Sequence, residues 1–200
     1  MLIEMINILF VDSQNFIKKL KEVFVAEGVQ MPDLSLYDFD GLFNKALQGI
    51  VLNRRIFYSG KLLMDEENRK KSYELIQRQR IMKNKLEEVG FEFLISGRVR
   101  PHLETDFNGR MVKIFKEKGV DVRMAVDMVS LACDGNLKTA VIASSDSDLQ
   151  PAVKELKNRG VELIYLGFEI SPNKGLTFTT DRTILIRNAE VIEFFAKTLI

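Results

Sequence analysis

Short runs of apolar residues alternate with longer segments in which apolar residues recur every three or four positions. The runs lie at 6–11, 51–58, 91–95, 138–143 and 161–166. They are continuous rather than alternating, which is typical of parallel strands buried on both faces. The periodic segments predict helices at about 16–27, 41–48, 66–89, 122–133 and 149–158. This order predicts an α/β fold with a mostly parallel sheet and right-handed crossovers.

Two helices have clear apolar stripes. In the first, the stripe is formed by Phe16, Leu20, Val23 and Phe24, and Gly28 follows as a C-cap. The helix at 66–89 has no proline or glycine, and its outer face carries basic residues. The segment between these helices is loop-like around Pro32, with a short strand expected near 36–39.

The segment 96–111 is rich in turn residues, and the following sequence RMVKIFKEKG predicts a strand that returns toward the body. We therefore expect a β-hairpin arm at 91–116. The sequence becomes less regular beyond Pro172, which predicts a C-terminal extension at 172–200 that ends in an amphipathic segment. The whole chain is expected to be one domain, 1–200, with its core at 6–166.

Composition excludes several classes of protein. The chain is 46% hydrophobic and 28% charged, as in ordinary globular proteins, and no apolar run is long enough to cross a bilayer. The N-terminus lacks the pattern of a signal peptide. Cys133 is the only cysteine, which excludes an internal disulfide and a cysteine-rich zinc site. We therefore expect a cytoplasmic protein without a membrane segment.

Charge is uneven along the chain, although the net charge is only +1. Residues 53–120 hold 16 Lys and Arg against 10 Asp and Glu, a local excess of +6, whereas residues 1–52 sum to −3 and 121–200 to −2. A basic surface of this kind can follow a polyanion. A solvated helix face explains the same count without a ligand.

Carboxylates follow the predicted strands at three places. Asp12 comes directly after INILFV, and Asp146 and Asp148 follow KTAVIA. In KGVDVRMAVDM, Asp121 opens a predicted helix and Asp127 lies within it. Because ligands of open parallel sheets bind outside the carboxyl ends of the strands, we expect these acids to gather at one edge.

Each acid also has a structural interpretation. Asp148 could cap or favour the N-terminus of the helix that Pro151 helps to start, and Asp121 could be the N-cap of its own helix. Asp12 is harder to explain in this way, since an acid at the end of a buried strand costs free energy unless it is paired or binds a cation. Asp127 lies in a helix that is apolar on nearly all sides, which also favours a functional role.

Carboxylates crowded at one edge repel each other unless a cation neutralises them. Hard oxygen ligands select Mg²⁺ or Mn²⁺, and one histidine and one cysteine cannot build a site of imidazole or thiolate ligands. A metal held by carboxylates suits phosphodiester hydrolysis, because it polarises the phosphate and lowers the pKa of a bound water. We expect Asn15 and Ser145 to orient water, substrate or the acids through hydrogen bonds.

The three acidic stretches resemble a known family. In order and spacing they are similar to the NYN domain of the LabA-like group, a branch of the PIN-like nuclease superfamily, from about Ile6 to Leu166. The matched stretches are FVDSQNF (Asp12, Asn15), KGVDVRMAVDMV (Lys118, Asp121, Asp127) and ASSDSDLQPAV (Ser144, Asp146, Asp148). Ser13 and Ser145 stand where the family has glycine, and either could crowd the backbone near a substrate.

The resemblance implies a three-layer α/β/α PIN-like fold and a metal-dependent ribonuclease. We expect Mg²⁺ or Mn²⁺ to bind among Asp12, Asp121, Asp127, Asp146 and Asp148, with Asn15 also in the catalytic set. One alternative is an RNA-binding or regulatory module that keeps the fold without turnover. Another is a phosphohydrolase with an aspartyl nucleophile, but that chemistry needs an acid two residues after Asp12, where Gln14 stands.

Basic residues predict where RNA would lie. Besides Asn15, Ser145 and Lys118, the expected contacts are Arg54, Arg55, Arg98 and Arg100, with Arg110 and Lys113 nearby. Phe91, Phe93 and Phe107 could stack bases, although phenylalanines in strands more often belong to the core. His102 is expected to be a solvated loop residue. The arm and the C-terminal segment each offer a surface on which two copies of the chain could pair.

Overall fold

Seven strands form one sheet in the part of the chain that the structure describes. The computed structural model describes residues 5–105 and 109–196, without the side chains of residues 67, 100–104, 112–117 and 196. The strands are β1 (Ile6–Asp12), β2 (Arg54–Lys61), β3 (Glu92–Thr105), β4 (Met111–Lys118), β5 (Leu137–Ala143), β6 (Glu162–Phe168) and β7 (Arg182–Ile186). Their order is β4-β3-β2-β1-β5-β6-β7, and every neighbouring pair except β3 and β4 is parallel. The predicted mostly parallel sheet is confirmed.

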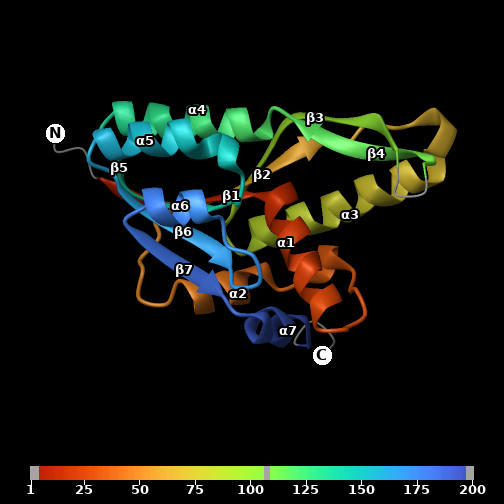
Figure 1. The fold of residues 1–200 in the computed structure, drawn as a ribbon, viewed down its shortest axis with the longest axis horizontal. Coiled ribbons are helices and arrows are strands. Elements are labelled where there is room, and N and C mark those ends of the chain that lie inside the picture. Colours follow the sequence, from red (N-terminus) through yellow and green to blue (C-terminus); the bar gives the residue numbers. More distant parts are fainter. Residues whose placement is uncertain (1–4, 106–108, 197–200) are drawn as a thin grey trace.

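Helices cover both faces of this sheet (Figure 1). One layer contains α1 (Ser13–Ala26), α2 (Phe39–Ala46), α3 (Arg69–Glu88) and α7 (Asn188–Ala196). The other contains α4 (Val120–Cys133), α5 (Gln150–Asn158) and α6 (Lys174–Thr179). Short 3-10 helices lie at η1 (Leu34–Leu36), η2 (Glu66–Asn68) and η3 (Ser147–Leu149). The predicted three-layer α/β/α fold is confirmed.

β1 shows why its sequence reads as a continuous apolar run. Ile8 and Phe10 point into the core beneath α4 and α5, whereas Leu9 and Val11 point into the core beneath α1 and α2. All four side chains are fully buried. A central strand buried on both faces needs apolar residues at successive positions. Its register therefore fixes Asp12 at the carboxyl edge of the sheet.

The predicted hairpin arm is also confirmed, and it is longer than the sequence indicates. β3 pairs antiparallel with β4 from Arg98 opposite Lys118 to Thr105 opposite Met111. At its base, a Cβ atom on Gly97 would lie 2.3 Å from the carbonyl oxygen of Lys118. Only glycine tolerates that approach, so Gly97 lets the end of β4 lie close beside β3.

One sequence prediction is wrong, and one segment is more regular than its sequence indicates. No strand forms near 36–39, because Asp33 and Asp38 accept hydrogen bonds from the amides of Ser35 and Gly41 and so cap η1 and α2. The segment beyond Pro172 adds β7 to the sheet and α7 to a helix layer. β7 is short and half exposed, so its sequence lacks the apolar run that marks the central strands.

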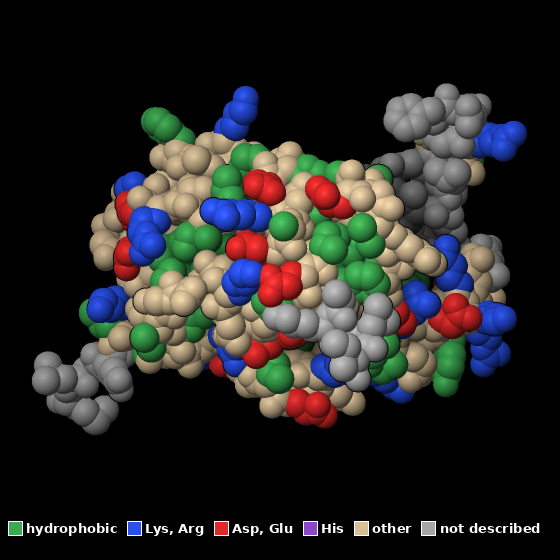
Figure 2. Space-filling view, turned by 90° about the horizontal axis from the view of Figure 1, so that it is seen from below, with side chains coloured by type: hydrophobic (Ala, Val, Ile, Leu, Met, Phe, Trp, Pro, Cys, Tyr) green, Lys and Arg blue, Asp and Glu red, His purple; other side chains and the backbone are tan. Residues whose placement is uncertain are grey.

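The uneven charge along the sequence does not give every face of the molecule a single sign of charge. On the face shown in Figure 2, lysines and arginines are interspersed with acidic side chains. Within the described residues, no helix has both the length and the apolar character needed to cross a bilayer.

Candidate functional site

An acidic pocket of about 470 Å³ lies at the carboxyl edge of the sheet. β1 and β5 are neighbours there, and α4 begins beside them. The polar side chains that line the pocket are Asp12, Gln14, Asn15, Lys18, Lys118, Asp121, Asp146 and Asp148. The structure therefore brings together four of the five acids that the sequence places after the strands and in the following helix.

Asp12 is the most buried acid of the pocket, with 6% of its surface exposed. One carboxylate oxygen accepts the backbone N–H of Asn15 at 3.2 Å and so caps α1. The other accepts the hydroxyl of Ser144 at 3.1 Å. Asp12 thus serves both as a helix cap and as part of the pocket wall.

Asn15 ties the start of α1 to the loop that follows β5. Its side-chain oxygen accepts the backbone N–H of Ser145 at 2.8 Å. The hydroxyl of Ser145 turns away from the pocket and lies 3.0 Å from the hydroxyl of Tyr165. No non-glycine residue in the described chain has a positive φ. Ser13 and Ser145 therefore replace glycine without backbone strain.

The loop after β5 presents Asp146 and Asp148 to the pocket. The hydroxyl of Ser144 accepts the N–H of Asp146 at 3.1 Å, and the carboxylate of Asp146 accepts the N–H of Asp148 at 2.9 Å. Asp146, not Asp148, therefore caps the short helix η3. The interpretation of Asp148 as a cap is therefore wrong, although Asp148 does lie in the first turn of η3, directly before α5.

The third side of the pocket is the junction of β4 and α4. Gly119 is the N-cap of α4 and has φ of 87°, a conformation that glycine adopts without strain. Asp121 then lies in the first turn of α4, where the helix dipole favours a negative charge. Because Gly119 occupies the capping position, Asp121 is free to face the pocket.

Charge accumulates around Asp12. Burial raises the pKa of the Asp12 carboxyl, hydrogen bonds from Asn15 and Ser144 oppose that rise, and the negative charges of Asp146 and Asp121 add to it. The net effect is a raised pKa, so ionising the Asp12 carboxyl costs more free energy in the folded protein than in the unfolded chain. This electrostatic arrangement favours a cation between the acids.

We expect the variant Asp12→Asn to melt at a higher temperature than the wild type in EDTA at pH 7. A raised carboxyl pKa contributes stability that is present below the unfolded pKa and is lost as pH rises through the folded pKa. The advantage of the variant over the wild type should therefore be larger at pH 7 than at pH 4. Thermal melts of both proteins at both pH values check this. A difference in melting temperature that is as large or larger at pH 4 would contradict the prediction.

Asp127 lies apart from the acidic pocket. Its carboxylate accepts the Tyr58 hydroxyl at 3.1 Å and forms an ion pair with Arg123 at 2.8 Å. The helix is apolar on most sides, as the sequence indicates, but it is not buried on all of them, because Val122 and Val126 are 60% and 54% exposed. The structure therefore gives Asp127 a supporting contact between α4 and β2 instead of a place in the pocket.

Most of the predicted RNA contacts are also dispersed. Arg54 and Arg55 begin β2, at the edge of the sheet opposite to Asp12, which pairs with Tyr58. Arg54 binds Glu92 at 2.7 Å, and Arg55 binds Asp40 and packs on Phe91. The structure therefore places these two arginines, with their partners, at the other edge of the sheet from the acidic pocket.

Two basic residues of the prediction do lie near the pocket. Lys118 lines it, and exposed Arg98 pairs with Lys118 in the hairpin. Phe91 and Phe93 are buried in the core, which excludes them as stacking platforms. The structure does not describe Phe107 or the side chains of Arg100, His102 and Lys113.

Sequence reasoning missed several contributors. Gln14 and Lys18 line the pocket from α1, and their i,i+4 spacing just after Asp12 is a signal that could have found them. Asn173 donates from its side-chain nitrogen to the carbonyl of Ser145 at 2.9 Å, and its backbone N–H donates to Tyr165 at 3.0 Å. No local sequence pattern predicts these hydrogen bonds, because α6 and β6 come close to the loop after β5 only in the tertiary fold.

The donor chemistry of the pocket fits a hard divalent cation, since Asp12, Asp121, Asp146 and Asp148 offer only oxygen ligands. Among the described residues, no three acidic, histidine or cysteine side chains are already grouped closely enough to hold a metal ion.

Comparisons with known proteins agree with the fold and with the family that the sequence resembles. A family model described as the NYN domain matches residues 8–187. The uncharacterized protein MJ0482 of Methanocaldococcus jannaschii is 30% identical over 114 residues, which are 52% of this chain and 47% of that protein. The match thus spans about half the length of this curated relative.

A solved structure shares the fold. The crystal structure of a protein of unknown function, VPA0982 from Vibrio parahaemolyticus, matches with a TM-score of 0.57 over 92% of this chain and 94% of that chain. The sequence identity is 16%, so the likeness concerns the fold alone.

Proposed function

The chain belongs to the NYN domain family, and on this premise we propose that it is a metal-dependent ribonuclease that hydrolyses RNA phosphodiester bonds in the acidic pocket. NYN domains are nuclease-like domains of the PIN-like superfamily with RNA-related functions. The observation that carries the proposal is the convergence of Asp12, Asp121, Asp146 and Asp148 on one pocket at the carboxyl edge of the sheet.

Asp12, Asp121 and Asp146 are the side chains that would hold Mg²⁺ or Mn²⁺, with Asp148 at the rim. A bound divalent cation supplies charge neutralisation at the phosphate and acidifies water. The burial of Asp12 and its neighbouring charges favour such a partner. The reaction is direct attack of water on phosphorus and needs no covalent intermediate.

The other residues of the pocket would position the substrate. Lys18 and Lys118 place two positive charges beside the acids, where they can hold a phosphate. Two hydrogen bonds hold the loop after β5: the Ser144 hydroxyl donates to the Asp12 carboxylate at 3.1 Å, and the Ser145 N–H donates to the side-chain oxygen of Asn15 on α1 at 2.8 Å. Because these bonds lock the loop, Asp146 keeps its position relative to Asp12.

The test is cleavage of a labelled single-stranded RNA by the wild type and by Asp121→Asn, in Mg²⁺, Mn²⁺ or EDTA. We expect cleavage with either metal, none in EDTA, and a loss of about 100-fold in the variant, as removing one preorganised charge commonly causes. Cleavage that is indifferent to EDTA would contradict the proposal. RNA binding without cleavage under any metal condition would instead support a binding module with the same fold.

Three finer features are proposed on the sequence alone. These are membership of the LabA-like group, a cytoplasmic location, and pairing of two copies through the hairpin arm or the C-terminal segment. Size-exclusion chromatography with light scattering tests the last of these.

A further inference from the structure

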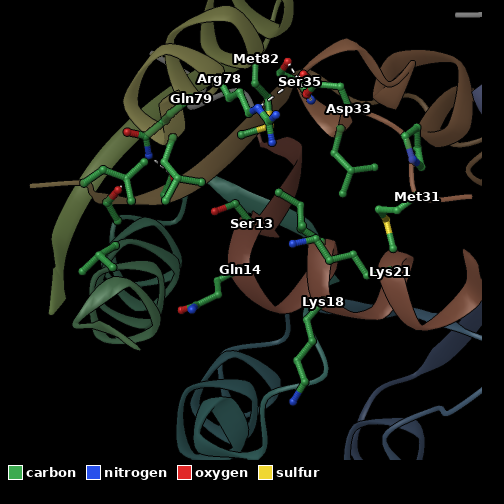
Figure 3. Close-up of a pocket in the computed structure, with 18 residues that line it drawn as sticks. Ser13, Gln14, Lys18, Lys21, Met31, Asp33, Ser35, Arg78, Gln79 and Met82 are labelled. Atoms are coloured by element: carbon green, nitrogen blue, oxygen red, sulfur yellow. Dashed lines mark hydrogen bonds and ion pairs between the residues drawn. The ribbon is translucent and has the colours of Figure 1, made fainter. Parts of the chain in front are cut away.

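A second pocket, of about 560 Å³, adjoins the acidic one and is not used by the chemistry described above. It lies between α1, α3 and the segment 31–35 (Figure 3). Its volume falls within the range of about 300–1,000 Å³ typical of small-molecule and cofactor sites. The pocket is therefore large enough for a nucleotide.

The lining combines apolar walls with a cationic rim. Met31, Leu75 and Met82 belong to the apolar walls, and an apolar surface can pack against the face of a base. Lys21 extends from α1, and Arg78 extends from α3 on the facing side (Figure 3). Such a combination of apolar contact and positive charge suits a nucleobase with its phosphate.

The cations of this pocket are available to a ligand. Within the described residues, Lys18 and Lys21 form no ion pair. Arg78 contacts Asp33 at 3.5 Å, but the two side chains are 58% and 39% exposed, so the pair contributes little. Asp33 also accepts two hydrogen bonds from Ser35, at 2.7 and 3.0 Å. A phosphate can therefore replace Asp33 as the partner of Arg78.

The two pockets adjoin each other and carry opposite charge. Gln14 and Lys18 line both of them. The charged residues of the second pocket are three cations and one acid, for a sum of +2, whereas those of the acidic pocket are four acids and two lysines, for a sum of −2. A chain of phosphates is drawn to the basic pocket, and a metal ion is drawn to the acidic one.

We propose that this basic pocket, lined by Lys21, Leu75, Arg78 and Met82, binds a nucleotide of single-stranded RNA next to the phosphate that is cleaved. The proposal rests on the proposed function and names the part of the substrate that the fold recognises. The base enters between the apolar walls, and the phosphates contact Lys21 and Arg78. Lys18, shared with the acidic pocket, lies along the path between the two.

The first test is binding of a fluorescent single-stranded RNA in EDTA, which prevents metal-dependent cleavage. We expect the variant Lys21→Gln/Arg78→Gln to bind at least about tenfold more weakly. A plot of log affinity against log salt concentration should become less steep by about 1.4, because each phosphate contact to a single strand adds about 0.7 to the steepness and the variant removes two contacts. The control is Arg80→Gln/Lys154→Gln, which removes the same charge from exposed positions outside both pockets. Equal weakening in the two double variants would overturn the proposal.

The second test is a series of RNAs that each lack one base. We expect one abasic position to weaken binding to the wild type by about fivefold, the lower end of what base stacking contributes. In Leu75→Ser, the same RNA should bind no worse than the intact RNA. A wild type that tolerates every abasic position equally would overturn the proposal, even if cleavage in Mg²⁺ is normal. A wild type that neither binds nor cleaves RNA would overturn the proposed function as well.

Discussion

The double variant Asp12→Asn/Asp146→Asn is expected to lose at least about 1,000-fold of its RNA cleavage, a loss of about 4 kcal/mol in transition-state stabilisation. Asp12 ends β1 and Asp146 lies in the loop after β5, so the variant removes charge from both strands that meet at the pocket. Single-turnover cleavage of a labelled RNA in saturating Mg²⁺ measures the effect.

Asp127→Asn is the matched control for this loss. It makes the same chemical change in an acid that contacts Tyr58 and Arg123 and does not line the pocket. We expect its cleavage rate to stay within about tenfold of the wild type, because the change weakens a supporting contact. If Asp127→Asn is as inactive as the double variant, the structure has assigned the acids wrongly.

A thermal-melt assay gives a second readout that does not depend on turnover. Saturating Mg²⁺ should raise the melting temperature of the wild type, since a ligand that binds only the folded state stabilises it. The same addition should leave the double variant unchanged. Equal stabilisation of both proteins would place the metal elsewhere.

The variant Phe16→Ala is expected to lose about 3–5 kcal/mol of unfolding free energy. Phe16 is 1% exposed and packs against Phe39, Phe43 and Phe168, with ring centroids 6.4, 5.0 and 4.8 Å away. Truncation leaves a cavity where α1, α2 and β6 meet. Because native domains are stable by only about 5–15 kcal/mol, chemical denaturation should show a large shift of the midpoint.

Phe178→Ala provides the control for this substitution. Phe178 lies on α6 and is 91% exposed, so its truncation should change stability by less than about 0.5 kcal/mol. A similar loss in both variants would show that the aromatic cluster around Phe16 does not carry the expected packing energy.

The sequence by itself determined the central strands and the positions of the main acids along the chain. β1 and β5 are buried on both faces, so their apolar runs are unmistakable, and the residues that follow them must lie at the carboxyl edge of the sheet. The stripe of α1 is equally clear, since Phe16, Leu20, Val23 and Phe24 are all buried. The sequence did not predict β7, because this strand is short and half exposed and so lacks a continuous apolar run.

Only the tertiary structure decided which side chains share a pocket. Asp121 and Asp127 are six residues apart on one helix, yet one lines the acidic pocket and the other pairs with Tyr58 and Arg123. Arg54 lies on the same strand as Tyr58, but it begins β2 four residues earlier and so lies at the opposite edge of the sheet. The basic pocket between α1 and α3 joins segments that are some fifty residues apart. Local periodicity sets the face that a residue occupies, whereas the packing of layers sets what that face meets.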